Sequence, residues 1–166
     1  ITKIANEDRL ESIYNFMRKE MDAKRQCYIV FPIIEESEKI DAKDAQSAYD
    51  KFKKEIFCNY SLGFLHGKLK KEEKKKLMDK VNEGSIQCLV ATTVVEVGIN
   101  NPNATVMVIE NSERFGLTQL HQLRGRIGRG NQASQCLLID PDSKNSTTNP
   151  RLKVMSDSQD GFFLAE

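Results

Sequence analysis

The stretch CYIVFPII, residues 27–34, indicates the fold class of this chain. Its apolar residues follow one another without alternating with polar ones, which is typical of a strand buried on both faces of a parallel sheet. Further strands are expected in SLGFLHG at 61–67, IQCLVATT at 86–93, ATVMVIE at 104–110 and SQCLLID at 134–140.

Helical segments are expected between these strands. Apolar residues at helical spacing predict a helix through residues 10–21, with Asn6 as its N-cap, and a second helix through residues 45–56. The polar segment EESEKIDAKD, residues 35–44, is expected to be a connection. A lysine-rich helix is expected to stop at Gly84, and Pro150 is expected to open a final helix. The alternation predicts a three-layer α/β domain, with a mainly parallel sheet and helices on both faces.

The composition limits the class of protein. The 166 residues are enough for one domain with a core, and 39% hydrophobic residues argue against disorder. Because the net charge is only +1, any contact with nucleic acid must come from a local patch. No apolar run is long enough to cross a bilayer, so we expect a cytoplasmic protein without a membrane partner.

The cysteines carry no metal-site pattern. Cys27, Cys58, Cys88 and Cys136 form no CxxC pair, and three of them lie in or beside apolar strand-like runs. We interpret them as core thiols in a reducing compartment, with a disulfide or zinc site as the less favoured alternative, and we expect no metal ligands in the chain.

The segment QLHQLRGRIGRG, residues 119–130, combines arginines with glycines on a predicted helix. One face of this helix is apolar, and the opposite one carries Gln122, Arg126 and Arg129, while Arg124 points elsewhere. Each interior glycine costs a helix about 0.5–1 kcal/mol relative to alanine. Gly125 and Gly128 therefore indicate a close approach by a backbone or ligand, and the guanidinium groups suit a phosphate. The alternative is a basic surface helix that ends at Gly130.

Two strand ends carry further groups that suit phosphate. Gly67 and Lys68 follow a strand and precede a helix, whose free N–H groups attract anions. Thr92 and Thr93 end the next strand, where their hydroxyls can bond phosphate oxygens. The alternatives are a solvated Lys/Glu helix face, which we favour for residues 74–76, and an ordinary loop within 91–104 with turn residues Gly98 and Pro102.

Three segments together resemble the second RecA-like half of superfamily-two helicases. They are HGKLKKEEKKKLMDKV at 66–81, the run from LVATT to GRIGRG at 89–130, and RLKVMSDSQDGFFLAE at 151–166. The narrower pattern ERFGLTQLHQLRGRIGRG, 113–130, is similar to RecG, a family of bacterial ATP-dependent DNA helicases that remodel branched DNA, and to transcription-repair coupling factors. FPIIEESEKID at 31–41 and the closing segment favour RecG.

The resemblance implies a role for each matching residue. Arg126 and Arg129 would act as arginine fingers beside Gln122, in an ATP site shared with a first RecA-like domain that holds most of the ATP and Mg²⁺. Gly98, Gly125, Gly128 and Asn100 would lie on the nucleotide side, and Glu96 in the coupling segment. Thr92, Thr93, Gly67 and Lys68 would contact the DNA backbone. Asn100 stands where most relatives carry Asp, so it can form hydrogen bonds but supplies no charge.

The resemblance also implies that residues 1–166 are a single second motor domain, in which 150–166 begin a further helical segment. The chain has no GxxxxGK[ST] loop and no DExH motif, so we expect it not to hydrolyse ATP alone and to be a fragment of a longer helicase that works with its other RecA-like domain. A coupling-factor motor and a non-catalytic nucleic-acid-binding module remain the alternatives.

Overall fold

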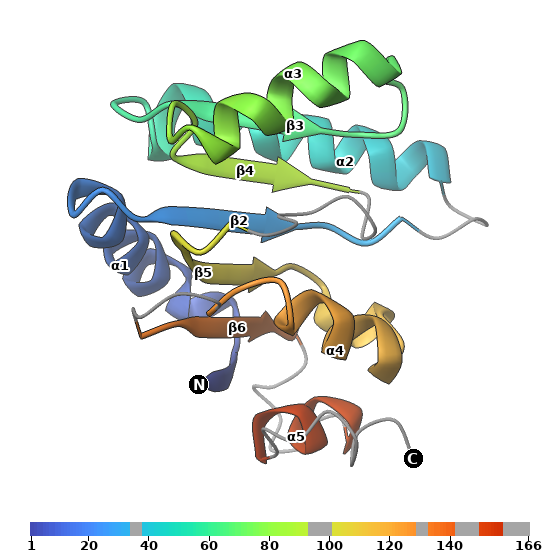
Figure 1. The fold of residues 1–166 in the computed structure, drawn as a ribbon. Coiled ribbons are helices and arrows are strands. Elements are labelled where there is room, and N and C mark those ends of the chain that lie inside the picture. Colours follow the sequence, from blue (N-terminus) through green and yellow to red (C-terminus); the bar gives the residue numbers. More distant parts are fainter. Residues whose placement is uncertain (34–37, 93–100, 129–132, 142–149, 158–166) are drawn as a thin grey trace.

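A computed structural model describes residues 1–33, 38–92, 101–128, 133–141 and 150–157 of the chain (Figure 1). Its centre is a six-stranded sheet in the order β1-β6-β5-β2-β4-β3, and every strand pairs in parallel with its neighbours. The strands are β1 (Thr2–Ala5), β2 (Gln26–Val30), β3 (Leu62–Leu65), β4 (Cys88–Ala91), β5 (Ala104–Ile109) and β6 (Gln135–Ile139). The predicted parallel α/β class is confirmed.

Helices cover both faces of this sheet, as predicted. One face carries α1 (Leu10–Asp22) and α2 (Glu38–Lys51), which continues into a π-helical turn at Phe52–Ile56. The other face carries α3 (Lys71–Asn82), α4 (Leu117–Arg124) and α5 (Pro150–Asp157). Short 3₁₀ turns at Glu7–Arg9 and Ser112–Arg114 precede α1 and α4. The helix that Pro150 was expected to open is therefore present, and its Leu152 and Met155 are buried in the core of this domain.

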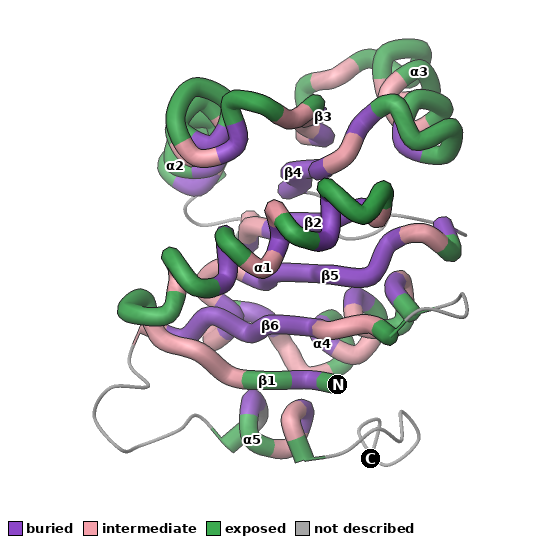
Figure 2. The backbone as a smooth tube through the Cα atoms, turned by 90° about the vertical axis from the view of Figure 1, so that its left-hand side faces the viewer, coloured by how far each residue is buried: buried purple, intermediate pink, exposed green. Residues whose placement is uncertain are grey.

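The core explains why the strand segments lack polar alternation. In β2, Cys27 and Ile29 pack on the α1 side, whereas Tyr28 and Val30 pack on the α3 and α4 side. Figure 2 shows the central strands buried along their length, with exposed residues on the outward sides of the helices. Because both faces are covered, the central strands are largely apolar, and their buried polar residues Gln26 and Thr105 are hydrogen-bonded.

The structure differs from the sequence-based expectations at several places. The edge strand β1 was not predicted, because it is only four residues long and just Thr2 among them is buried. Helix α2 begins at Glu38, so much of the expected connection 35–44 is helical. Asn6 caps the 3₁₀ turn rather than α1, and its side chain accepts a hydrogen bond from the Asp8 N–H.

The cysteine prediction holds for three residues and is wrong for one. Cys27, Cys88 and Cys136 are buried thiols of the core, and burial raises the pKa of each. Cys58 is exposed, because it lies in the turn after the π-helical segment rather than in a strand. Within the described ranges, no helix has the length and apolar character needed to cross a membrane.

Candidate nucleotide and DNA site

The candidate DNA contacts lie at the carboxyl end of the sheet, where the segments after β3 and β4 meet. The Thr92 N–H after β4 donates to the Leu65 carbonyl at the end of β3, at 3.0 Å. This bond places Thr92 beside the turn that follows β3. In that turn the Lys68 N–H donates to His66 Nδ1 at 3.3 Å. The structure therefore brings together Thr92, Gly67 and Lys68, which were predicted separately.

These three residues differ in how much surface they offer. Gly67 and Lys68 are exposed, whereas Thr92 is only 5% exposed. A Cβ built at Gly67 would meet no atom within 4 Å, and Gly67 has no left-handed φ angle. The fold therefore does not require glycine at this position. A ligand that approaches the backbone closely is a reason for a glycine here.

The start of α3 is less open to anions than expected. Glu73 Oε1 accepts a hydrogen bond from the Lys70 N–H at 3.2 Å, so a carboxylate of the chain already occupies part of this helix terminus. At this point a phosphate would be attracted by the positive charge of the exposed Lys68 side chain rather than by the N-terminus of α3.

The arginine segment is not one continuous helix, which corrects the prediction. Helix α4 ends at Arg124, and Gly125 is its C-cap with φ −68°. The Arg126 N–H then donates to the Leu123 carbonyl at 2.9 Å, in a turn that follows the helix. Gln122 is exposed in the last helical turn, and Arg126 is half-buried just beyond it. The two residues remain close in sequence, but they do not share a helical face.

Gly128 ends this turn for reasons internal to the chain. Its φ is +74°, a left-handed conformation that residues with a Cβ adopt at a cost. A Cβ at Gly128 would also lie 2.4 Å from Ser134 Oγ, whereas a Cβ at Gly125 would make ordinary contacts of 3.5 Å. Gly128 is therefore explained by the fold itself, and Gly125 is not.

Arg124 points away from this segment, as predicted. Its Nη1 donates to the Met155 carbonyl of α5 at 3.0 Å, and partial burial lowers the pKa of its guanidinium. Arg124 therefore joins α4 to α5.

Several residues of the predicted site lie outside the described residues. They are Thr93, Gly98, Asn100 and Arg129, together with Glu96 of the coupling segment.

An ion pair that the sequence analysis missed holds the segment before α4. Arg114 Nη1 and Nη2 donate to the two carboxylate oxygens of Asp41, at 3.0 and 3.2 Å. Asp41 stands near the start of α2, and Arg114 lies in the 3₁₀ turn before α4. This bidentate pair links the first turn of α2 to the 3₁₀ turn before α4.

A second missed group is Glu110, which directly follows β5. Its N–H donates to the Val30 carbonyl at 2.9 Å, so it stands where the two central strands end. Burial, together with the carboxylates of Glu7 and Glu113, raises the pKa of Glu110 to about 7. This carboxyl group therefore changes its charge near neutral pH. Its position after an apolar run carried no signal of burial in the sequence.

The first prediction concerns Gly128. Gly128→Ala is expected to lower the free energy of unfolding by about 1–3 kcal/mol, because the new Cβ would be strained and crowded by Ser134. Urea denaturation of the chain measures the change. Gly125→Ala is the matched control and should change the free energy of unfolding by less than about 0.5 kcal/mol. Equal losses for both variants would contradict this account of Gly128.

The structure places no cluster of metal ligands at this edge. In the parts of the chain that it describes, there is no group of three or more His, Cys, Asp or Glu side chains that could hold a metal ion. The described candidate residues instead supply positive and hydrogen-bonding groups: Lys68 follows β3, Gln122 lies in the last turn of α4, and Arg126 lies in the turn after it. Such groups match phosphate oxygens.

Comparison with known proteins identifies the relatives of this chain. Residues 8–131 match the family described as "Helicase conserved C-terminal domain". The ATP-dependent DNA helicase RecG of Synechocystis is 50% identical over 99% of the chain, and RecG of Bacillus subtilis is 46% identical over 96%. The chain covers 20% and 23% of these two proteins, so it spans about a fifth of the length of the relatives it matches.

Solved structures agree with these sequence relatives. A structure of RecG bound to a three-way DNA junction superposes with a TM-score of 0.78 at 42% identity, over 99% of this chain and 21% of that one. The yeast protein Dbp5 bound to RNA and ADP BeF3 shares the fold with a TM-score of 0.64, at 20% identity, over 99% of this chain and 39% of that one. The RecA-like fold is therefore confirmed, and the coupling-factor alternative is not favoured. The chain belongs to the helicase conserved C-terminal domain family, and RecG helicases are similar to it over nearly its whole length.

Proposed function

We propose that residues 1–166 act as the second motor domain of an ATP-dependent DNA helicase that remodels branched DNA, at replication forks and recombination junctions. The observation that carries this proposal is the similarity to RecG along 99% of the chain, together with the match to RecG bound to a three-way junction. In such a helicase the chain would work with a first RecA-like domain, in the cytoplasm.

Arg126 and Arg129 are the proposed arginine fingers of the ATP site, with Gln122 beside them. ATP supplies the phosphoryl group, and Mg²⁺ neutralises part of its charge, both held mainly by the first domain. The exposed Gln122 and Gly125 lie at the open end of α4, and Arg126 follows at once. Gly125 is exposed and has no Cβ, which would let a ligand approach its backbone, while Gly128 has the left-handed φ of +74°. Gly98 and Asn100 complete the proposed nucleotide side.

The proposed DNA track crosses the ends of β3 and β4. Gly67 and Lys68 offer an exposed turn to the DNA backbone, with space for a phosphate where a Cβ would otherwise lie. Thr92 is bonded to Leu65 beside this turn, and Thr93 follows it. Because Thr92 is buried, we assign the larger share of the DNA affinity to Gly67 and Lys68.

The second prediction tests this track in a RecG-type helicase that carries this chain as its second motor domain. Gly67→Ala should weaken the binding of branched DNA by about 3–10-fold, because the added methyl group occupies the space of the phosphate contact. Lys68→Ala should weaken the binding similarly. It should also reduce the slope of the logarithm of the binding constant against the logarithm of the salt concentration by about 1. Thr92→Val should change the affinity less but reduce DNA-stimulated ATP turnover. Titrations of a labelled three-way junction at several salt concentrations measure these changes.

Two controls separate a DNA contact from a folding defect. Gly67→Ala should leave the melting temperature unchanged, since its Cβ meets nothing in the chain. Lys75→Ala removes the same charge as Lys68→Ala from an exposed position within α3, and it should leave DNA affinity within about twofold. Unchanged affinity in both Gly67→Ala and Lys68→Ala would mean that the DNA track lies elsewhere.

A further inference from the structure

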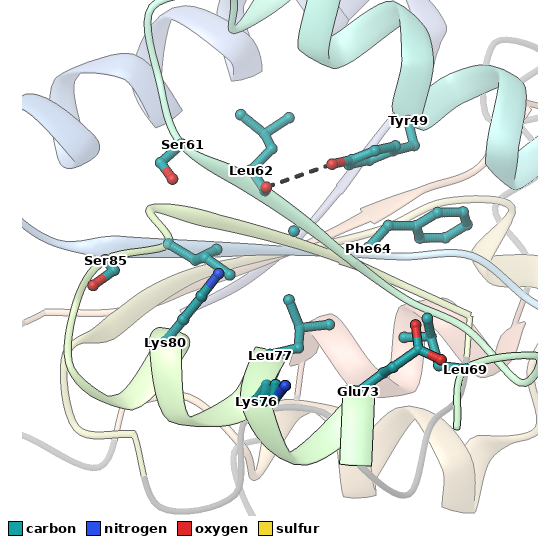
Figure 3. Close-up of a pocket in the computed structure, with 12 residues that line it drawn as sticks. Tyr49, Ser61, Leu62, Phe64, Leu69, Glu73, Lys76, Leu77, Lys80 and Ser85 are labelled. Atoms are coloured by element: carbon teal, nitrogen blue, oxygen red, sulfur yellow. Dashed lines mark hydrogen bonds between the residues drawn. The ribbon is translucent and has the colours of Figure 1, made fainter. Parts of the chain in front are cut away.

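A groove of about 550 Å³ lies along the outer edge of β3, between α2 and α3 (Figure 3). β3 is the last strand in the order of the sheet, so no other strand of the described residues covers this edge. None of the proposed nucleotide or DNA contacts is in the lining of this groove, although Leu69 of the lining directly follows Lys68. Its lining comes from β3 and the residues beside it, from Tyr49 of α2, and from one side of α3 that includes Lys76, Leu77 and Lys80.

The main-chain groups of β3 point alternately toward β4 and toward this groove. The carbonyls of Ser61 and Leu65 face β4, because they accept hydrogen bonds from the N–H groups of Cys88 and Thr92, at 3.2 and 3.0 Å. Since direction alternates along a strand, the N–H and C=O groups of Leu62 and Phe64 face outward. The hydroxyl of Tyr49 donates to the Leu62 carbonyl at 3.4 Å, which shows that this carbonyl faces the groove.

The walls of the groove are apolar and held in place. On the α2 side, the rings of Tyr49 and Phe64 stack with their centroids 5.0 Å apart. On the α3 side, Leu77 packs against the core cluster beneath it. An open strand edge between two apolar walls matches the groove that a further β-strand fills when a peptide adds to a sheet.

The rim of the groove is positively charged. Lys76 and Lys80 are exposed on the side of α3 that lines the groove, as Figure 3 shows. The acidic residue of the lining, Glu73, turns one carboxylate oxygen toward the Lys70 N–H of its own helix. Electrostatic complementarity therefore favours a ligand with negative side chains.

We propose that the outer edge of β3 binds an extended, acidic peptide segment of a partner protein. The segment adds as a strand beside Leu62 and Phe64 through main-chain hydrogen bonds, and in doing so it displaces the long 3.4 Å hydrogen bond of the Tyr49 hydroxyl to the Leu62 carbonyl. Its apolar side chains pack between Tyr49 and Leu77, and its carboxylates lie near Lys76 and Lys80. A peptide fits better than a nucleic acid, because main-chain donors and acceptors at strand spacing match another strand and the walls are apolar.

The third prediction tests this proposal with a fluorescent ten-residue peptide that alternates aspartate with isoleucine. The 166-residue chain should bind it, and Lys76→Glu/Lys80→Glu should weaken the binding by about tenfold or more. Lys71→Glu/Lys75→Glu makes the same charge change on positions of α3 outside the groove lining and should change the affinity less than about twofold. Fluorescence anisotropy measures the affinities, and thermal melts check that each variant is folded.

Changes to the peptide test how it binds. N-methylation of alternate peptide amides should abolish binding if the peptide adds as a strand, and replacing its aspartates by lysines should do the same. The amide signals of Leu62 and Phe64 should shift in NMR spectra of the complex. No binding of the acidic peptide would mean that the lysines only protect an open edge. Three results would each overturn the proposal. The first is that the lysine peptide binds as tightly as the acidic one, and the second is that single-stranded DNA competes for this groove. The third is that the chain forms dimers through this edge, which Lys76→Glu/Lys80→Glu dissociates.

Discussion

Arg126→Ala is expected to slow ATP turnover by about 10³-fold or more in a RecG-type helicase that carries this chain, while ATP affinity changes little. An arginine finger stabilises the charge that develops on the phosphoryl group in the transition state, whereas the ground-state triphosphate is held mainly by the other domain. Arg129→Ala should have a similar effect. Single-turnover hydrolysis, measured together with nucleotide affinity, separates the two contributions.

The structure supplies the controls for this prediction. Arg126→Lys should restore little activity, because a point charge does not reproduce the planar fork of the guanidinium. Arg124→Ala should reduce turnover much less, because Arg124 donates to the Met155 carbonyl and acts on the packing of α5. Equal and small effects at Arg124, Arg126 and Arg129 would leave this segment as a basic surface, with no role in ATP hydrolysis.

Arg114→Leu is expected to lower the free energy of unfolding of the chain by about 2–4 kcal/mol. The substitution removes a bidentate partner from Asp41, whose side chain is 4% exposed, while that of Arg114 is 31% exposed. Because Arg114 is partly exposed, we expect a smaller decrease in the free energy of unfolding than for a fully buried ion pair. Urea denaturation measures the change.

Two further variants test the cause of this loss. Asp41→Asn/Arg114→Leu should recover part of the stability, because no buried charge then remains without its guanidinium. Glu11→Gln interrupts the pair between Arg18 and the exposed Glu11, whose charged atoms are 3.7 Å apart, and should cost less than about 0.5 kcal/mol. A loss for Arg114→Leu no larger than that for Glu11→Gln would show that this pair does not hold α2 to the turn before α4.

The sequence was sufficient to predict the parallel sheet and most of its strands. Segments such as CYIVFPII and ATVMVIE are apolar at most of their buried positions, because helices cover both faces of the sheet. This local signal is lost at the edges, where one side of a strand meets solvent. β1 was therefore missed, and it is defined only by its pairing with β6, more than a hundred residues away.

The sequence motif also indicated which arginines and glycines form the candidate site, but it did not indicate their geometry. Periodicity continues a helix through Arg126, whereas the structure ends α4 at Arg124 with Gly125 as its C-cap, and Gly128 then adopts a left-handed φ beside Ser134. Local spacing cannot report a contact between segments that meet only after folding.

By itself, the sequence determined the α/β class, the helicase family and the residues proposed to contact phosphate, since each depends on composition or on a short pattern. The tertiary structure decided how these parts are joined. It pairs Asp41 with Arg114, 73 residues apart, buries Thr92 beside the exposed Gly67, and places β3 at the end of the sheet, where no other strand of the described residues pairs with its outer edge. These features depend on strand order and on long-range packing, which bring together side chains that no local pattern connects.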